Sequence, residues 1–257
     1  GTFFNKGQTV DVTVTVTDTI ASDTAAAASV LVRNTPPTTP DLSIELPEPS
    51  YRCTAVAFDG EDDWIDLGSY ESDDFTGNAD FTIEAWVKPL DTEGHSILGR
   101  GNAEPSSSNR FIQLRLDSLN RVYFGIRGTA GEAETAELTT ADSVAVDTWT
   151  HIAAVRDYGN TLTVYIDGVA SGITPDNAGD VPFEGETNYW SLGRQSDFYS
   201  PPPLNHFAGS MTEIRLWSMA RTEEELNDHM DQRVEPDSVG LSGYWPLDDG
   251  SGTTVAE

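Results

Sequence analysis

Short runs of alternating apolar and polar residues recur along most of the chain, and segments rich in glycine, asparagine and aspartate separate them. The clearest runs are FTIEAWV (81–87), RFIQLRL (110–116), RVYFGIR (121–127), THIAAVR (150–156), TLTVYID (161–167), NYWSLG (188–193) and MTEIRLW (211–217). Alternation with period two places successive side chains on opposite faces of a strand. Many short strands at this spacing are typical of antiparallel sandwiches, so the pattern predicts an all-β fold.

One short helix is predicted after the last of these runs. Thr222 precedes three glutamates and then Leu226. Thr222 and Glu225 have the spacing of a capping box, and acidic side chains stabilise the first turn of a helix.

The N-terminal residues have a different pattern. Residues 1–34 hold two β-rich runs, QTVDVTVTV (8–16) and ASVLV (28–32), joined by a polar connection. Two strands are too few for an independent domain. Residues 35–52 are rich in proline, which predicts an extended linker. The main domain is therefore expected at residues 53–257.

Two strand faces carry specific expectations. Leu162, Val164 and Ile166 share one face, which should point into the core. Glu84 shares a face with Trp86, and a carboxylate is rarely buried without a partner. We expect Arg156 or Arg215 to pair with Glu84 in a structural ion pair, rather than a catalytic role for this acid.

Several segments, in order, resemble a laminin-G-like domain of the concanavalin-A-like lectin/glucanase superfamily. They are AVAFDGEDDWIDLG (55–68), FTIEAWVKP (81–89), ILGRG (97–101), DTWTHIAAVRD (147–157), LTVYIDGV (162–169), SLGRQ (191–195) and FAGSMTEIRLWSMARTEEEL (207–226). The resemblance implies a jelly-roll β-sandwich of two antiparallel sheets with one short helix, whose first and last strands lie side by side. Tyr244 and Trp245 would then supply the closing strand beside residues 55–60.

The N-terminal residues resemble the last two strands of a bacterial immunoglobulin-like repeat, followed by the proline-rich junction that opens the next one. This resemblance implies that residues 1–34 form a β-hairpin from an immunoglobulin-like sandwich. Such a hairpin would be completed by a neighbouring domain or chain, because its edges are otherwise unpaired.

Charge narrows the range of partners. The formal net charge is −29, with 43 acidic and 14 basic residues. This field repels nucleic acid and anionic lipid, and favours cations, Ca2+ above all, and neutral ligands such as glycans. No stretch approaches the length of an apolar membrane span, so membrane insertion is not expected. The single cysteine, Cys53, excludes an internal disulfide and a cysteine-based zinc site.

Catalytic motifs are not found. Glucanases of the superfamily carry carboxylates at alternate positions of one strand, because retaining hydrolysis needs an acid and a nucleophile about 5 Å apart. The nearest acids here, Glu61 to Asp63, form a turn cluster, and no serine or cysteine is combined with a histidine and an acid in a recognisable motif. We therefore expect a protein that is not an enzyme.

Acid-rich turns suggest a Ca2+ site, since this ion takes six to eight oxygen ligands. If the first and last strands are neighbours, two turns could share an ion; their acids are Asp59, Glu61, Asp62, Asp63, Asp248 and Asp249. The alternative is a solvated acidic turn. Asp176, Asp180 and Asp197 are a second, weaker candidate.

A glycan site is predicted in the loop at residues 185–207, where aromatic residues alternate with polar ones. The candidate ligand-binding residues are Asn188, Arg194, Asp197, Phe198, Tyr199, Asn205 and His206. Trp190 and Phe207 lie on strands and are expected in the core instead.

These features together predict a non-catalytic recognition or adhesion module, secreted or at the cell surface. Its partner would be a glycan or an extracellular protein, with Ca2+ as a structural or ligand-bridging ion. The alternative is a structural subunit or spacer of an extracellular assembly, whose N-terminal strands complete a neighbouring domain or a further copy of the chain. A carbohydrate-binding appendage of an enzyme is a third interpretation.

Overall fold

The computed structural model describes residues 16–17, 22–23, 55–68, 78–101, 110–128, 131–181, 190–195 and 206–248. The chain divides into two compact units, Gly1–Leu46 and Pro47–Glu257. Among the described residues, no helix combines the length and the apolar composition needed to cross a bilayer.

The described residues of the first unit form an antiparallel strand pair, β1 (Val16–Thr17) and β2 (Ser22–Asp23). β1 overlaps the end of the first predicted N-terminal run. β2 lies within the segment expected to be a connection, and the run at 28–32 falls outside the described residues.

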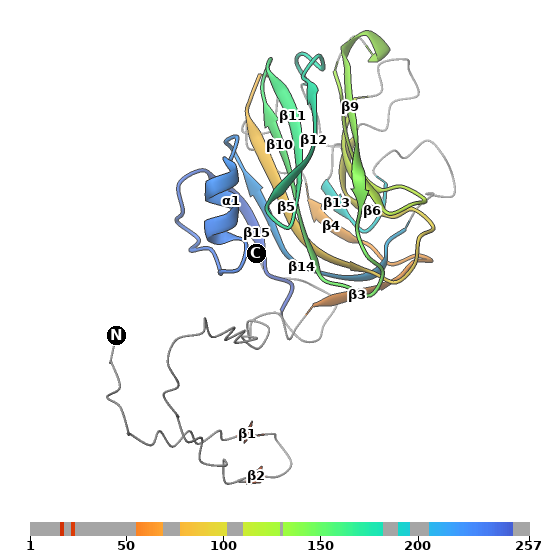
Figure 1. The fold of residues 1–257 in the computed structure, drawn as a ribbon, viewed down its shortest axis with the longest axis vertical. Helices are drawn as coiled ribbons and strands as arrows, with labels where there is room; N and C mark the ends of the chain where they lie inside the picture. Colours follow the sequence, from red (N-terminus) through yellow and green to blue (C-terminus); the bar gives the residue numbers. More distant parts are fainter. Residues whose placement is uncertain are drawn as a thin grey trace, which may run out of the picture. The chain divides into compact units, whose positions relative to one another are not determined.

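The second unit is a sandwich of two antiparallel sheets (Figure 1), which confirms the predicted fold class. The seven-stranded sheet has the order β12 (Val169–Pro175), β11 (Thr161–Ile166), β10 (Thr150–Asp157), β5 (Phe81–Pro89), β14 (Ala208–Trp217) and β15 (Leu241–Trp245), with β3 (Val56–Asp59) also paired to β14. The six-stranded sheet has the order β4 (Ile65–Gly68), β13 (Trp190–Leu192), β6 (Ser96–Gly101), β7 (Phe111–Leu116), β8 (Arg121–Arg127) and β9 (Thr135–Ser143). A 3-10 turn, η3 (Gly131–Glu134), precedes β9.

The main core lies between the two sheets. Leu162 and Val164 are buried in it and Ile166 packs against it, as the alternation in β11 predicted. Trp190, the first residue of β13, and Phe207, which directly precedes β14, are also buried there, as expected.

The outer face of the seven-stranded sheet is buried too, because helix α1 (Glu223–His229) packs on it. Leu226 contacts a small cluster with Ala153 and Val155 on β10, and α1 lies outside this sheet in Figure 1. Thr222 caps the helix: its side chain accepts a hydrogen bond from the Glu225 backbone N–H, and the Glu225 carboxylate accepts one from the Thr222 backbone. The predicted capping box is therefore confirmed.

The closing strand is not where the resemblance placed it. β3 pairs with β14 at residues 208–211, whereas β15 pairs with β14 at residues 214–217. Since β5 occupies the other edge of β14, β3 and β15 follow one another along the same edge. The expectation that they lie side by side is wrong, because β14 is long enough to pair with both.

Glu84 occupies the centre of this covered face and is fully buried. The Nε2 atom of His151 lies 3.1 Å from its Oε2 atom, in hydrogen-bonding range. Two guanidinium groups flank the carboxylate, with Nη1 of Arg215 3.6 Å from Oε2 and Nη1 of Arg221 3.5 Å from Oε1. The predicted pairing with Arg215 is confirmed, while Arg156 instead binds Asp176 at 2.8 Å.

A second buried acid extends this network. Glu213 accepts hydrogen bonds from Arg215 and from the Tyr244 hydroxyl, both at 2.8 Å. It lies at the register shift of β14 and has a φ of 54°, a strained conformation for a residue other than glycine. Burial and the bond to Glu213 raise the pKa of Tyr244, so its hydroxyl remains a donor.

Burial by itself raises the pKa of Glu84, but the hydrogen bond and charge of His151 and the charges of Arg215 and Arg221 outweigh it. The pKa of Glu84 therefore lies below its ordinary value of 4.5. The carboxylate is ionised at neutral pH, and the fold requires that charge.

The substitution Glu84→Gln removes this charge, which leaves Arg221 without its buried counterion and Arg215 with Glu213 alone. We expect a loss of about 3 kcal/mol in the free energy of unfolding, measured by urea denaturation. Glu224→Gln, on the exposed side of α1, is the matched control and should stay within about 0.5 kcal/mol of the wild type. Equal stabilities of the two variants would contradict a structural role for Glu84.

The stability difference between the wild type and the same variant should depend on pH in a defined direction. Because the pKa of Glu84 is lower in the folded state, its stabilising contribution is complete above the unfolded-state value near 4.5 and is lost as the pH falls through the folded-state value. The stability difference between wild type and Glu84→Gln should be constant from pH 7 to about 5 and should shrink below about 4.5. Parallel urea titrations would show it, and an undiminished difference at about pH 3 would argue against it.

Candidate functional site

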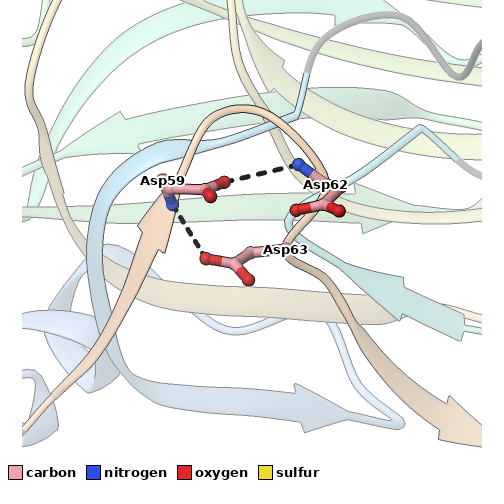
Figure 2. A group of neighbouring side chains, drawn as sticks. All are labelled: Asp59, Asp62 and Asp63. Atoms are coloured by element: carbon pink, nitrogen blue, oxygen red, sulfur yellow. Dashed lines mark hydrogen bonds between the residues drawn. The ribbon is translucent and has the colours of Figure 1, made fainter.

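The turn that follows β3 gathers acidic side chains through backbone hydrogen bonds. Oδ1 of Asp59 accepts from the backbone N–H groups of Glu61 at 2.8 Å and Asp62 at 3.3 Å. The backbone N–H of Asp59 donates to Oδ2 of Asp63 at 3.0 Å, and Figure 2 shows this bond together with the bond between Asp59 and Asp62 across the turn. Gly60 allows the reversal, since its φ is +83°.

The result is a compact group of three carboxylates. Ligand oxygens of Asp59, Asp62 and Asp63 lie within 4.8 Å of one another, and all three residues are exposed. The N–H of Glu61 makes the largest contribution to the lowered pKa of Asp59, so this carboxylate is ionised at neutral pH. Glu61 supplies a backbone donor to the turn, but its carboxylate is not part of the group.

The other predicted metal ligands do not join this turn among the described residues. Asp248 pairs with Arg233. It follows β15, which ends opposite Ile214, whereas Asp59 pairs with Ala208 at the far end of β3. Sharing of an ion between these two turns was expected only because the strands were thought to be side by side. Asp249 lies outside the described residues.

The weaker calcium candidate is also used structurally. Asp176 binds Arg156 through Oδ2 at 2.8 Å, and its other carboxylate oxygen accepts the N–H of Ala178 at 3.0 Å. Asp180 is exposed, and Asp197 lies outside the described residues.

An exposed tryptophan stands directly after the acidic turn. Trp64 is 39% exposed, and the guanidinium carbon of Arg194 lies 3.2 Å from the centroid of its ring. The contact follows from strand pairing, since Ser191 on β13 lies opposite Asp66 on β4. Burial lowers the pKa of Arg194, and the charge of Asp66 partly offsets this effect.

Besides Arg194, His206 is the other predicted ligand-binding residue that the structure describes. It is 8% exposed, and neither ring nitrogen has a hydrogen-bond partner among the described residues. The next residue, Phe207, donates its N–H to the Gly193 carbonyl at 2.8 Å, which brings residue 206 close to Arg194. Asn188, Asp197, Phe198, Tyr199 and Asn205 lie outside the described residues.

Close packing joins these features into one corner of the sandwich, which we name the Trp64 corner: Asp59–Asp63, Trp64, Asp66, Arg194 and His206. A side chain at Gly193 would have its Cβ 2.7 Å from the Phe58 ring and 3.4 Å from the Asp63 carbonyl oxygen. Glycine is therefore needed where the loop approaches the acidic turn.

Trp64 was not among the predicted site residues, although a signal was present. In DDWIDLG the alternation puts Ile65 and Leu67 on the packed face and Trp64 with Asp66 on the exposed face. The corner thus combines an exposed aromatic ring with a guanidinium donor and carboxylate acceptors, a combination that suits a polar ligand with an apolar face.

Solved structures with the same fold include carbohydrate-binding proteins. A proposed carbohydrate-binding protein from Bacteroides ovatus has a TM-score of 0.60 and 20% identity, over 79% of this chain and 54% of that one. The CBM40 module of the Ruminococcus gnavus IT-sialidase has a TM-score of 0.53 and 13% identity, over 68% of this chain and 95% of that one. These likenesses show the fold.

A curated relative is the adhesion G-protein coupled receptor V1 of Danio rerio, 23% identical over 168 residues. The match covers 65% of this chain but only 3% of the receptor. The family model of the concanavalin A-like lectin/glucanases superfamily, a laminin G type, matches residues 59–227. Because this match includes more than half of the sequence, the chain belongs to that family.

Proposed function

We propose that the chain is a non-catalytic binding module that recognises a glycan at the Trp64 corner. The observation that carries the proposal is the exposed indole of Trp64 with the Arg194 guanidinium stacked on it, beside Asp66 and the acidic turn. The similar Bacteroides protein is a proposed carbohydrate-binding protein, and the Ruminococcus module has been solved with α2,3-sialyllactose bound.

The chemistry of the corner matches that of a sugar ring. One face of a pyranose is apolar and packs on an aromatic ring, while its hydroxyls both donate and accept hydrogen bonds. Arg194 offers donors, and Asp63 and Asp66 offer acceptors. Asn188, Asp197, Phe198, Tyr199 and Asn205 remain predicted members of the same site, on the loop that carries Arg194 and His206.

Ca2+ is part of the proposal as a structural ion of the acidic turn. Asp59, Asp62 and Asp63 would hold it, since clustered carboxylates are the ligands that hard cations prefer. The bound ion would neutralise the turn and stiffen the segment that presents Trp64. Backbone carbonyls and water would complete the set of oxygens.

We also propose an extracellular location, because the chain's family includes lectins and the Danio rerio relative is named as an adhesion receptor. The N-terminal hairpin remains a proposed piece of an immunoglobulin-like repeat. In this arrangement the sandwich would be one recognition module in a longer surface protein.

Trp64→Ala tests the glycan proposal on a glycan array. For the glycans that the wild type binds, we expect binding to be lost or the affinity to fall by roughly 30-fold, equivalent to about 2 kcal/mol, because a central aromatic contact is removed. Tyr199→Ala should weaken binding of the same glycans if its loop forms part of the site.

Leu119→Ala is the control for this experiment. Leu119 is 61% exposed and lies in the turn between β7 and β8, so its loss should leave binding unchanged. The bound glycans should also be recovered intact after long incubation. An array with no hits, or hits unaffected by Trp64→Ala, would reject the Trp64 corner as the glycan site.

The calcium proposal predicts a thermal shift. Removing Ca2+ with a chelator should lower the melting temperature by several degrees, and Asp62→Asn should abolish the response because one of the three clustered carboxylates is lost. Glu61→Gln removes a charge from the same turn but leaves the three clustered carboxylates intact, so this variant should keep the thermal response to Ca2+ removal. Equal responses in both variants would indicate a general charge effect of Ca2+ on an acidic protein.

A further inference from the structure

A cavity of about 480 Å3 opens beside helix α1, on the outer side of the seven-stranded sheet. Its wall includes Trp217 at the end of β14, Met219 and Arg221 from the segment between β14 and the helix, and Glu235 and Ser238 from the segment that returns to β15. Its volume is within the range of small-molecule sites, roughly 300–1,000 Å3. We refer to it as the α1 pocket.

The α1 pocket is far from the Trp64 corner. Asp59 of the corner pairs with Ala208 at the first residue of β14, and Trp217 is the last residue of the same strand. At a rise of about 3.3 Å per residue, the two ends of β14 are roughly 30 Å apart. A ligand in the pocket would therefore not touch the corner.

The wall of the pocket holds buried donors whose partners are missing. Trp217 Nε1 and the Nε and Nη1 atoms of Arg221 are buried and make no hydrogen bond with the described residues. Among the described residues, the partner of Arg221 Nη1 is Glu84, in the ion pair at 3.5 Å. Because buried polar groups are nearly always hydrogen-bonded, these donors point to an acceptor that the protein does not itself supply.

Arg221 is held in place before any ligand arrives. Its guanidinium carbon lies 3.9 Å from the Trp217 ring centroid, and its Nη2 atom donates to the Glu225 carbonyl at 2.9 Å. Its backbone N–H donates to the Thr82 hydroxyl at 3.0 Å. A side chain fixed by this many contacts loses little freedom on binding, which favours recognition.

The charges around the pocket are already balanced. Arg221 is paired with Glu84, and Arg233, which also lines the pocket, is paired with Asp248. Glu235 presents an exposed carboxylate, and the whole chain carries a net charge of −29. A ligand with a negative charge would meet repulsion without an unpaired cation to offset it.

We infer that the α1 pocket binds a neutral saccharide unit, as a second site independent of the Trp64 corner. Its hydroxyl oxygens accept from Trp217 Nε1 and Arg221, and one of its hydroxyls donates to Glu235. The apolar side chains of Met219 and Val239 pack against the carbon face of the ring. The pocket thus supplies donors, an acceptor and an apolar wall, as a sugar requires.

The indole N–H of Trp217 reports on this site in a proton–nitrogen correlation spectrum. Its signal is assigned by comparison with Trp217→Phe, which keeps an aromatic ring under Arg221. The full chain is titrated with glucose, galactose, mannose, N-acetylglucosamine, cellobiose and lactose, and in parallel with glucuronate and galacturonate. We expect at least one neutral sugar to shift the Trp217 signal in a saturable way.

Matched variants test the contacts. Glu235→Ala should lower the affinity measured in this titration by roughly tenfold, because it removes a charged hydrogen-bond acceptor. Asp237→Ala, an exposed acid of the same segment that does not line the pocket, should leave it unchanged. The dispersed backbone signals of each variant verify that it is folded.

The possible outcomes separate the two sites. Persistence of the Trp217 shift in Trp64→Ala supports an independent pocket, even if the Trp64 corner binds no glycan at all. The inference is overturned if no sugar moves the Trp217 signal, if only the uronates do, or if Trp64→Ala abolishes the shift.

Discussion

A carboxylate buried at the centre of a sheet must be neutralised within a few ångströms, and Glu84 imposes that requirement on every element around it. β10 supplies His151, β14 supplies Arg215 and the segment before α1 supplies Arg221. Arg215 in turn donates to the carbonyls of His229 and Gln232, where the chain leaves the helix. The ion network therefore fixes where α1 lies on the sheet, and with it the wall of the α1 pocket.

Local pattern was sufficient for the elements that depend on neighbours in sequence. Period-two alternation identified strands in both sheets (β5, β7, β8, β10, β11, β13 and β14) but not β9 or β12, and Thr222 with Glu225 identified the start of α1. The partner of Glu84 could be narrowed to two arginines, because a buried acid needs a cation and few are present. Arg221 was missed because it precedes the helix, and nothing local shows that the chain there folds back over β5.

Features that depend on the register between strands distant in sequence could not be predicted from the sequence. The alternation in β3 and β15 is the same whether they pair with each other or share one edge of β14. The acidic turn could be predicted as a cluster, since Asp59, Asp62 and Asp63 are close in sequence, but the place of Asp248 could not. Trp64 is the opposite case, since its exposure followed from simple alternation and was overlooked beside the acids before it.

The end-to-end arrangement of β3 and β15 also determines how the domain would respond to a pulling force. The start of β3 lies opposite Met211, and the end of β15 lies opposite Ile214, three positions away on β14. Tension carried through the segments before β3 and after β15 would enter the sandwich at these adjacent points. It would load the hydrogen bonds along one edge of β14 and bypass the core between the sheets. Under load, β3 and β15 would separate from β14 first, leaving the rest of the seven-stranded sheet and the whole six-stranded sheet unstressed.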